Sequence, residues 1–174
     1  MTDTHNETLS VTERLAAIEA IRALKARYFR LMDTKDWVQW EHVFAPDATM
    51  DMTGESASLR SLGFELPPNI ALTWHGAAEI RSAVSTALTN VTSVHHGHMP
   101  ELEILSPRTA TGIWAMEDLI LYGHGAPVAG FRGYGHYFDA YTKIEGRWHI
   151  HSTRLTRLCI RPIPLGKQAP RRAE

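Results

Sequence analysis

Residues 10–33 read SVTERLAAIEAIRALKARYFRLMD, and this stretch sets the character of the fold. Its apolar residues recur at steps of three and four, which is the spacing of one face of an α-helix. Ser10 followed three residues later by Glu13 is a capping box, the usual start of a helix. The sequence therefore predicts a long amphipathic helix that begins at residue 11 and ends near Asp33.

The rest of the chain changes from helical to strand patterns. We expect a short helix over 37–44 that ends at Pro46, a short strand over 48–52 and a third helix over 76–89. The stretch 53–73 has no clear period and is predicted to be a long loop that forms a rim or lid. Four strands follow, over 94–105, 109–122, 132–144 and 147–160. Helices followed by an antiparallel meander predict an α+β domain.

The bulk composition bounds the class of protein. The 174 residues suit one domain with one sizeable core, which we assign to 10–160, with 1–9 as a disordered lead-in and 161–174 as a C-terminal tail. The net charge of −1, without a charged block, argues against nucleic acid or a membrane surface as the main partner. Cys159 is the only cysteine, which fits a cytoplasmic protein without a disulfide.

Four polar residues stand in segments that otherwise have a buried pattern. These residues are Tyr28, Asp33, His95 and Asp118. A carboxylate or an imidazole inside an apolar element is costly unless it has a partner. One shared pocket explains the four residues better than four separate exceptions, and such a pocket would hold acid–base chemistry.

The strand TATGIWAMEDLILY, residues 109–122, supplies the wall of this pocket. Alternation places Trp114 and Met116 on the same face as Asp118, and an aromatic and thioether surface suits a planar organic ligand. The alternative is that Asp118 is exposed and Glu117 faces inward.

The run His95-His96-Gly97-His98 begins the first long strand, so one of the first two histidines must face the core. An aspartate bonded to one ring nitrogen of that histidine would leave the other nitrogen as a base. Alternation separates His95 from the other two histidines, so we predict no metal site.

Three further residues are candidates for substrate binding. Tyr134 and His136 share one strand face, with Gly133 and Gly135 between them as the signs of a bend. Arg154 and Arg157 lie on opposite faces of the last strand, and one of them could bind an anion or an enolate. We include Arg157 among the candidates, although alternation alone leaves open which of the two faces the pocket.

Several short motifs resemble the SnoaL-like branch of the nuclear transport factor 2-like superfamily. The resemblance covers about residues 10–160 and depends on the order of its motifs more than on any one of them. The motifs are Ala26–Asp33, Asp36-Trp37, Phe44–Ala48, His95–Gly97, Gly112–Trp114 with Glu117-Asp118, Gly133–Tyr137 and Gly146–Ile150. The resemblance implies a cone-shaped, curved mixed sheet, wrapped by N-terminal helices around a deep pocket.

The resemblance also implies an activity. Scytalone dehydratase and bile-acid 7α-dehydratase, members of this superfamily, carry a similar constellation, and Tyr28, Asp33, His95 and Asp118 match its positions. The implied activity is that of a cofactor-independent lyase, a dehydratase acting on a small hydrophobic cyclic, polyketide-like or steroid-like substrate. His95 would be the general base and Asp33 would orient it. Tyr28 would polarise a carbonyl or help the departing oxygen, and Asp118 would position substrate or a water.

Two alternatives remain open. An isomerase or a polyketide cyclase of the same fold would use the same base, and a non-catalytic module that binds a small ligand or a protein would need only the apolar wall. We also expect a homo-oligomer, a dimer or a trimer, because the strand pattern places apolar residues on the outer face of the sheet. Those residues are Ile113, Leu119, Leu121 and Tyr141.

Overall fold

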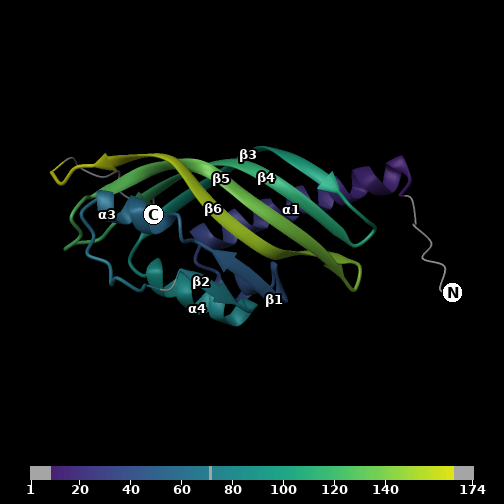
Figure 1. The fold of residues 1–174 in the computed structure, drawn as a ribbon, viewed down its shortest axis with the longest axis horizontal. Coiled ribbons are helices and arrows are strands. Elements are labelled where there is room, and N and C mark those ends of the chain that lie inside the picture. Colours follow the sequence, from purple (N-terminus) through teal and green to yellow (C-terminus); the bar gives the residue numbers. More distant parts are fainter. Residues whose placement is uncertain (1–8, 71, 167–174) are drawn as a thin grey trace.

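The computed structural model describes residues 9–70 and 72–166 of the chain. Helices and strands follow one another in the predicted order, with the helices first and the long strands last (Figure 1). The elements are α1 (Val11–Asp33), α2 (Trp37–Glu41), β1 (Phe44–Asp51), α3 (Glu55–Ser61), β2 (Thr73–His75), α4 (Ala77–Ala87), β3 (Thr92–Ile104), β4 (Thr109–Leu121), β5 (Gly130–Ile144) and β6 (Arg147–Ile163).

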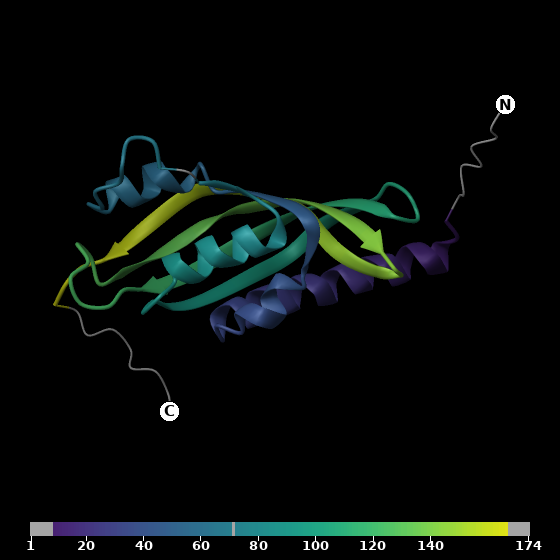
Figure 2. The same cartoon turned by 90° about the horizontal axis from the view of Figure 1, so that it is seen from below.

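The strands form one curved, unclosed sheet in the order β2-β1-β6-β5-β4-β3. The pairing is antiparallel except between β1 and β6, which run parallel. Helix α1 runs along the sheet, and helix α4 also lies against the sheet (Figure 2). The predicted α+β class with a mixed, curved sheet is confirmed, and the open end of the curve is where a pocket can form.

Helix α1 follows from its sequence pattern. The capping box is present, because Ser10 Oγ accepts from the Glu13 backbone N–H while the Glu13 carboxylate accepts from the Ser10 backbone N–H. The apolar stripe faces the sheet, where Ile21 and Leu24 are buried in the main core. Burial of each such side chain stabilises the fold by about 1.5–3 kcal/mol. The helix is therefore fixed along its length, and its end at Asp33 is held against the sheet.

The chain departs from prediction between 37 and 52. Helix α2 ends at Glu41, and strand β1 begins at Phe44, so Pro46 lies inside the strand instead of ending a helix. The register between β1 and β6 shifts between Phe44 and Thr49. A proline is tolerated at such an irregularity because it removes no regular ladder hydrogen bond.

The segment predicted to be a loop over 53–73 contains the short helix α3. Phe64 packs its ring on Tyr122 at a centroid distance of 4.9 Å, and Leu62 joins a second small core with Ile120 and Phe131. In Figure 2 α3 lies over the end of β6. Packing against the sheet holds this segment in place. Such contacts with distant residues leave no periodic pattern in the sequence of the segment itself.

The two ends of the chain can be compared with the prediction only in part. Leu9 packs against the main core, and β6 continues to Ile163, beyond the predicted boundary at residue 160. The remainder of the predicted lead-in and most of the predicted tail lie outside the described residues. Within residues 9–70 and 72–166, no helix is both long enough and apolar enough to cross a membrane.

Two residues predicted on the outer face of the sheet are in fact buried. Tyr141 and Leu121 are 2% and 8% exposed. Tyr141 lies on the inner face of β5, where its hydroxyl donates to Asp139. These two residues therefore give no support to self-association, which stays a prediction.

Candidate active site

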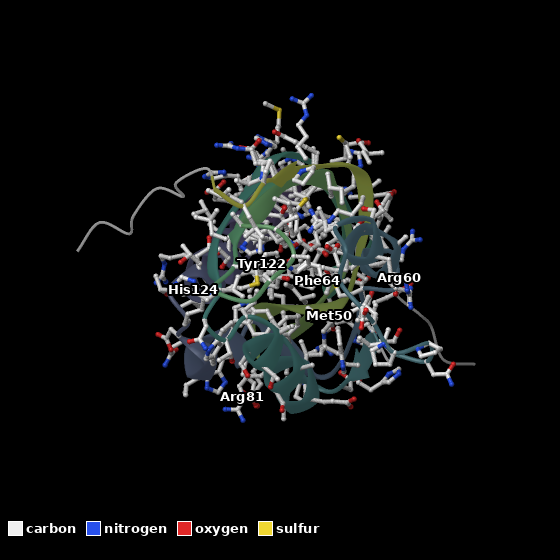
Figure 3. All side chains as sticks on the ribbon, turned by 90° about the vertical axis from the view of Figure 1, so that its left-hand side faces the viewer. Met50, Arg60, Phe64, Arg81, Tyr122 and His124 are labelled. Carbon is white, nitrogen blue, oxygen red and sulfur yellow. The ribbon has the colours of Figure 1, made fainter. Side chains whose placement is uncertain are left out.

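A mostly apolar hollow of about 290 Å³ lies between the inner face of the sheet, the end of α1, helix α4 and the 53–72 segment. Figure 3 looks at this end of the molecule, with Met50, Phe64 and Tyr122 near its centre and Arg60, Arg81 and His124 toward its edge. The polar groups in its wall come from several elements. The lining residues are Tyr28, Met32, Met50, Met52, Glu55, Leu59, Phe64, Leu72, Trp74, Val84, Ala87, Leu88, His95, Asp118, Ile120, Tyr122, Phe131, Tyr137, Leu155 and Arg157.

His95 and Asp33 form a short contact at this hollow. His95 Nδ1 lies 2.6 Å from Asp33 Oδ1, and the His95 side chain is 6% exposed. The backbone N–H of His95 also donates to Asp33 Oδ2, at 2.8 Å. In the neutral imidazole, the carboxylate as acceptor places the ring proton on Nδ1 and leaves Nε2 with its lone pair. The arrangement is that of an oriented base in the wall of an apolar pocket.

The surroundings of the pair fix both side chains. Ser93 Oγ donates to Asp33 Oδ1 at 2.9 Å, and Lys35 Nζ donates to Ser93 Oγ at 2.8 Å. Phe29 stacks on the His95 ring, with an interplanar angle of 12°. A Cβ on Gly97 would overlap the Phe29 ring, so the glycine in the His-His-Gly run makes room for this stack.

Tyr28 and Tyr137 form a second polar group in the wall. Both side chains are buried, and their hydroxyls hydrogen-bond to each other. Burial, reinforced by the negative charge of Asp139, raises the pKa of Tyr28. Burial, reinforced by the neighbouring Tyr28, raises the pKa of Tyr137. Both phenols therefore stay protonated, and the hydroxyl that accepts the hydrogen bond within the pair can donate its own proton to a ligand.

A buried ion pair lies beside the two tyrosines. Lys25 Nζ lies 2.7 Å from Asp139 Oδ2 and 4.4 Å and 4.0 Å from the ring centroids of Tyr28 and Tyr137. Asp139 also accepts from the hydroxyls of Tyr141 and Thr153, each at 2.7 Å. Burial lowers the pKa of Lys25, and Asp139 opposes this effect. The pair forms a rigid polar support behind the tyrosine wall of the hollow.

The buried tyrosines predict a loss of stability at alkaline pH. Burial raises the pKa of Tyr28, Tyr137 and Tyr141 above the ordinary value of 10.0. Above that pH the unfolded chain releases protons that the folded chain keeps, so the free energy of unfolding falls as pH rises. Each group contributes up to about 1.4 kcal/mol per pH unit. Urea unfolding across alkaline pH, with tyrosinate absorbance recorded in parallel, measures this. Ionisation of these three tyrosines while the fold stays intact would contradict the assignment.

Arg157 lies between two carboxylates at the other side of the hollow. Its guanidinium contacts Glu55 Oε2 through Nε at 2.7 Å and Asp118 Oδ2 through Nη2 at 2.6 Å. Burial opposes the positive charge, but the carboxylates of Glu55 and then Asp118 outweigh it, and the pKa of Arg157 is raised. A Cβ at Gly133 would collide with Arg157 and Asp118, so Gly133 provides the space for this cluster.

The structure brings together most of the residues that the sequence singled out. Tyr28, His95, Asp118 and Arg157 all line the hollow, and Asp33 bonds to His95. Asp118 faces inward and is 3% exposed, whereas Glu117 is partly exposed and pairs with His96. Of the two arginines that alternation could not separate, Arg154 packs over the Phe138 ring and Arg157 faces the hollow.

Other predicted residues lie elsewhere. Trp114 is buried in the core, where Nε1 donates to the Tyr141 hydroxyl, and it is not part of the lining. Met116 lies behind the cluster, where its sulfur is 3.6 Å from Arg157 Nη1. The prediction that Tyr134 and His136 line the hollow is wrong. The odd-numbered residues of this part of β5 face inward, and of these Tyr137 lines the hollow. Gly133 and Gly135, which flank Tyr134, occupy that inner face and leave room above it.

The sequence interpretation missed Glu55, Tyr137, Lys25 and Asp139. Tyr137 and Asp139 alternate with Tyr141, and this phase would have identified the inner face of β5. Lys25 follows Leu24 and precedes Tyr28 by three residues, so it belongs to the helical stripe. Glu55 had no signal, because only the packing of α3 against β6 brings its carboxylate to Arg157.

Comparisons with known proteins agree with this architecture. The family model of the SnoaL-like domain matches residues 13–154. A curated protein of Gibberella zeae, named "Probable cyclase FGR4", is 24% identical over 151 residues, which cover 86% of this chain and 95% of that protein.

Solved structures show the same fold at low identity. A type 2 hexachlorocyclohexane dehydrochlorinase is similar with a TM-score of 0.74 and 18% identity, over 92% of this chain and 98% of the other. A Novosphingobium aromaticivorans protein, named "Putative Scytalone Dehydratase", gives a TM-score of 0.71 and 17% identity, over 92% of this chain and 100% of the other. At 17–18% identity, these similarities establish a shared fold and no shared activity. The chain belongs to the SnoaL-like domain family, within the nuclear transport factor 2-like superfamily.

Proposed function

We propose that this protein is a cofactor-independent lyase that removes water from a small hydrophobic ring compound, with His95 as general base. The observation that carries the proposal is the 2.6 Å contact between His95 Nδ1 and Asp33 Oδ1 at the wall of an apolar hollow. A base held in one tautomer beside a pocket that a ligand can enter is the arrangement that proton abstraction needs.

The proposed elimination has two proton transfers. His95 Nε2 takes a proton from the carbon next to a carbonyl, and the electron pair forms the new double bond as the carbon–oxygen bond to the hydroxyl group breaks. The proton on Nε2 then passes to the departing hydroxide, which leaves as water. Asp33 stabilises the imidazolium between the two transfers. The hydrogen-bonded pair of Tyr28 and Tyr137 donates its one free hydroxyl proton toward the carbonyl oxygen, where negative charge develops.

The lining of the hollow supports the substrate class. Its walls are mainly methionine, leucine and aromatic side chains, which suit a cyclic, polyketide-like or steroid-like skeleton. The volume of about 290 Å³ favours the smaller members of that class. The Asp118 carboxylate, held in place by Arg157, would accept a hydrogen bond from the polar end of the substrate.

A cyclase or an isomerase is the second candidate, and the name of the Gibberella zeae relative favours it. Both reactions would use the same base and the same tyrosines. Mass spectrometry of the product separates the candidates, because elimination removes the mass of one water whereas isomerisation leaves the mass unchanged. A panel of cyclic β-hydroxy ketones provides the substrates, and formation of the conjugated ketone is followed by ultraviolet absorbance.

The Asp33→Asn variant tests the role of the pair. An amide cannot stabilise the imidazolium and can hold the ring in the wrong tautomer, so we expect kcat to fall about 10²-fold or more. The matched control is Asp36→Asn, because Asp36 caps α2 three residues away and asparagine also caps well. A full rate in the Asp33 variant, on a substrate that the unmodified protein converts, would end the proposed mechanism.

A further inference from the structure

The five N–H groups of Arg157 are all engaged by the protein itself. Nε and Nη2 donate to Glu55 at 2.7 and 3.3 Å, and Nη1 and Nη2 donate to Asp118 at 3.0 and 2.6 Å. The remaining N–H of Nη1 points to the sulfur of Met116 at 3.6 Å. A guanidinium has five N–H donors, so Arg157 has none left for a ligand anion.

The charges at this side of the hollow do not balance. Arg157 carries one positive charge against the two carboxylates of Glu55 and Asp118, which leaves one negative charge in the wall. All three side chains are 11% exposed or less, so water screens this charge poorly. Arg157 alone would attract a carboxylate ligand. Together with Glu55 and Asp118 it forms a cluster whose net charge is negative and which repels such a ligand.

Glu55 is the member of the cluster that produces this inversion. It is the buried residue of α3, and it comes from the 53–72 segment, whereas Asp118 and Arg157 belong to the sheet. The start of α3 is fixed against β6, because a Cβ at Gly54 would lie only 3.2 Å from the Leu155 carbonyl oxygen. Met52 N–H also donates to the Leu72 carbonyl and closes the base of the segment.

We propose that Glu55 determines which ligands enter the hollow by their charge, so that the site accepts uncharged or cationic ring compounds and rejects carboxylates. The inference rests on the proposed use of the hollow as a ligand site, but not on the reaction that occurs there. It narrows the substrate class to alcohols and ketones without an acid group near the Arg157 end.

Three probes with the same ring system test the charge rule. Naphthol, naphthylmethylamine and naphthoate present a neutral, a positive and a negative group at neutral pH, and isothermal titration calorimetry measures their affinities. Naphthoate should bind the unmodified protein at least about tenfold more weakly than naphthol. The Glu55→Gln variant keeps an acceptor for Arg157 but removes the charge. It should narrow the gap, which is the ratio of the naphthol affinity to the naphthoate affinity, by about tenfold. The matched control Glu65→Gln removes the same charge from another position of the same segment, outside the lining, and should leave the gap unchanged.

A second variant covers the case in which Glu55→Gln loosens α3. Asp118→Asn removes one charge from the opposite side of Arg157 and should narrow the gap in the same direction. The proposal is overturned if naphthoate binds the unmodified protein as tightly as naphthol, or if the Glu55 and Glu65 variants change the gap equally. If naphthoate binds more weakly than naphthol but none of the cyclic β-hydroxy ketones is converted, the charge rule holds and the proposed reaction is wrong. If a ketone is converted but the two probes bind equally well, the proposed reaction holds and the charge rule is wrong.

Discussion

His95→Ala is expected to reduce turnover about 10²–10⁴-fold, the usual contribution of a positioned acid–base group, while the protein stays folded. The His95 ring lines the hollow, where it contacts Asp33 and stacks on Phe29. Its removal therefore eliminates the proton acceptor without opening a large cavity in the apolar core.

The adjacent residue provides the control for this experiment. His96 is exposed and pairs only loosely with Glu117, at 3.4 Å, so His96→Ala should keep the full rate. Initial rates on any ketone that the unmodified protein converts, together with circular dichroism of each variant, separate lost chemistry from lost structure. Partial recovery of the His95 variant by added imidazole would support the role of the ring. A folded His95→Ala variant with undiminished turnover would rule out His95 as the base.

Asp139→Asn is expected to lower the free energy of unfolding by about 3–5 kcal/mol, because it leaves the ammonium group of Lys25 buried without a counter-charge. The Lys25 and Asp139 side chains are 1% and 0% exposed, so water cannot replace the lost partner. A domain is commonly stable by only about 5–15 kcal/mol, so this single substitution removes a large part of the total.

A second substitution separates the charge effect from packing. Lys25→Met combined with Asp139→Asn leaves no uncompensated charge and should recover most of the loss. The exposed pair of Arg22 and Glu19, 3.8 Å apart, is the control, and Arg22→Met should cost less than about 1 kcal/mol. Urea denaturation of the variants gives the free energies. If the double variant is no more stable than Asp139→Asn alone, the unpaired ammonium group is not the cause.

Much of the fold could be predicted because its signals are local. The stripe and capping box of the first helix, the alternation of β4 and the Glu145-Gly146 turn, whose residues both have positive φ, are written in neighbouring residues. The same local signals indicated Tyr28 at the buried face of α1 and Asp118 at the inner face of β4. The helix α3 lacks such a signal and depends on contacts with distant strands.

The site could be predicted only where a polar residue interrupts an apolar pattern. Gly133 and Gly135 have no side chains to mark the inner face of β5, and this caused the wrong phase for Tyr134 and His136. The helical pattern alone favours a solvated charge at Lys25, because lysine is rarely buried. Its burial depends on Asp139, which lies 114 residues further along the chain.

The contact between Asp33 and His95 joins positions 62 residues apart, from the end of the first helix to the first long strand. Helical turns form on a submicrosecond timescale, whereas contacts between distant segments form later because the intervening chain must first be brought together. A refolding molecule would therefore regain its helical signal before the contact between Asp33 and His95 forms. The proposed general base is therefore completed only after these two distant segments of the chain have come together.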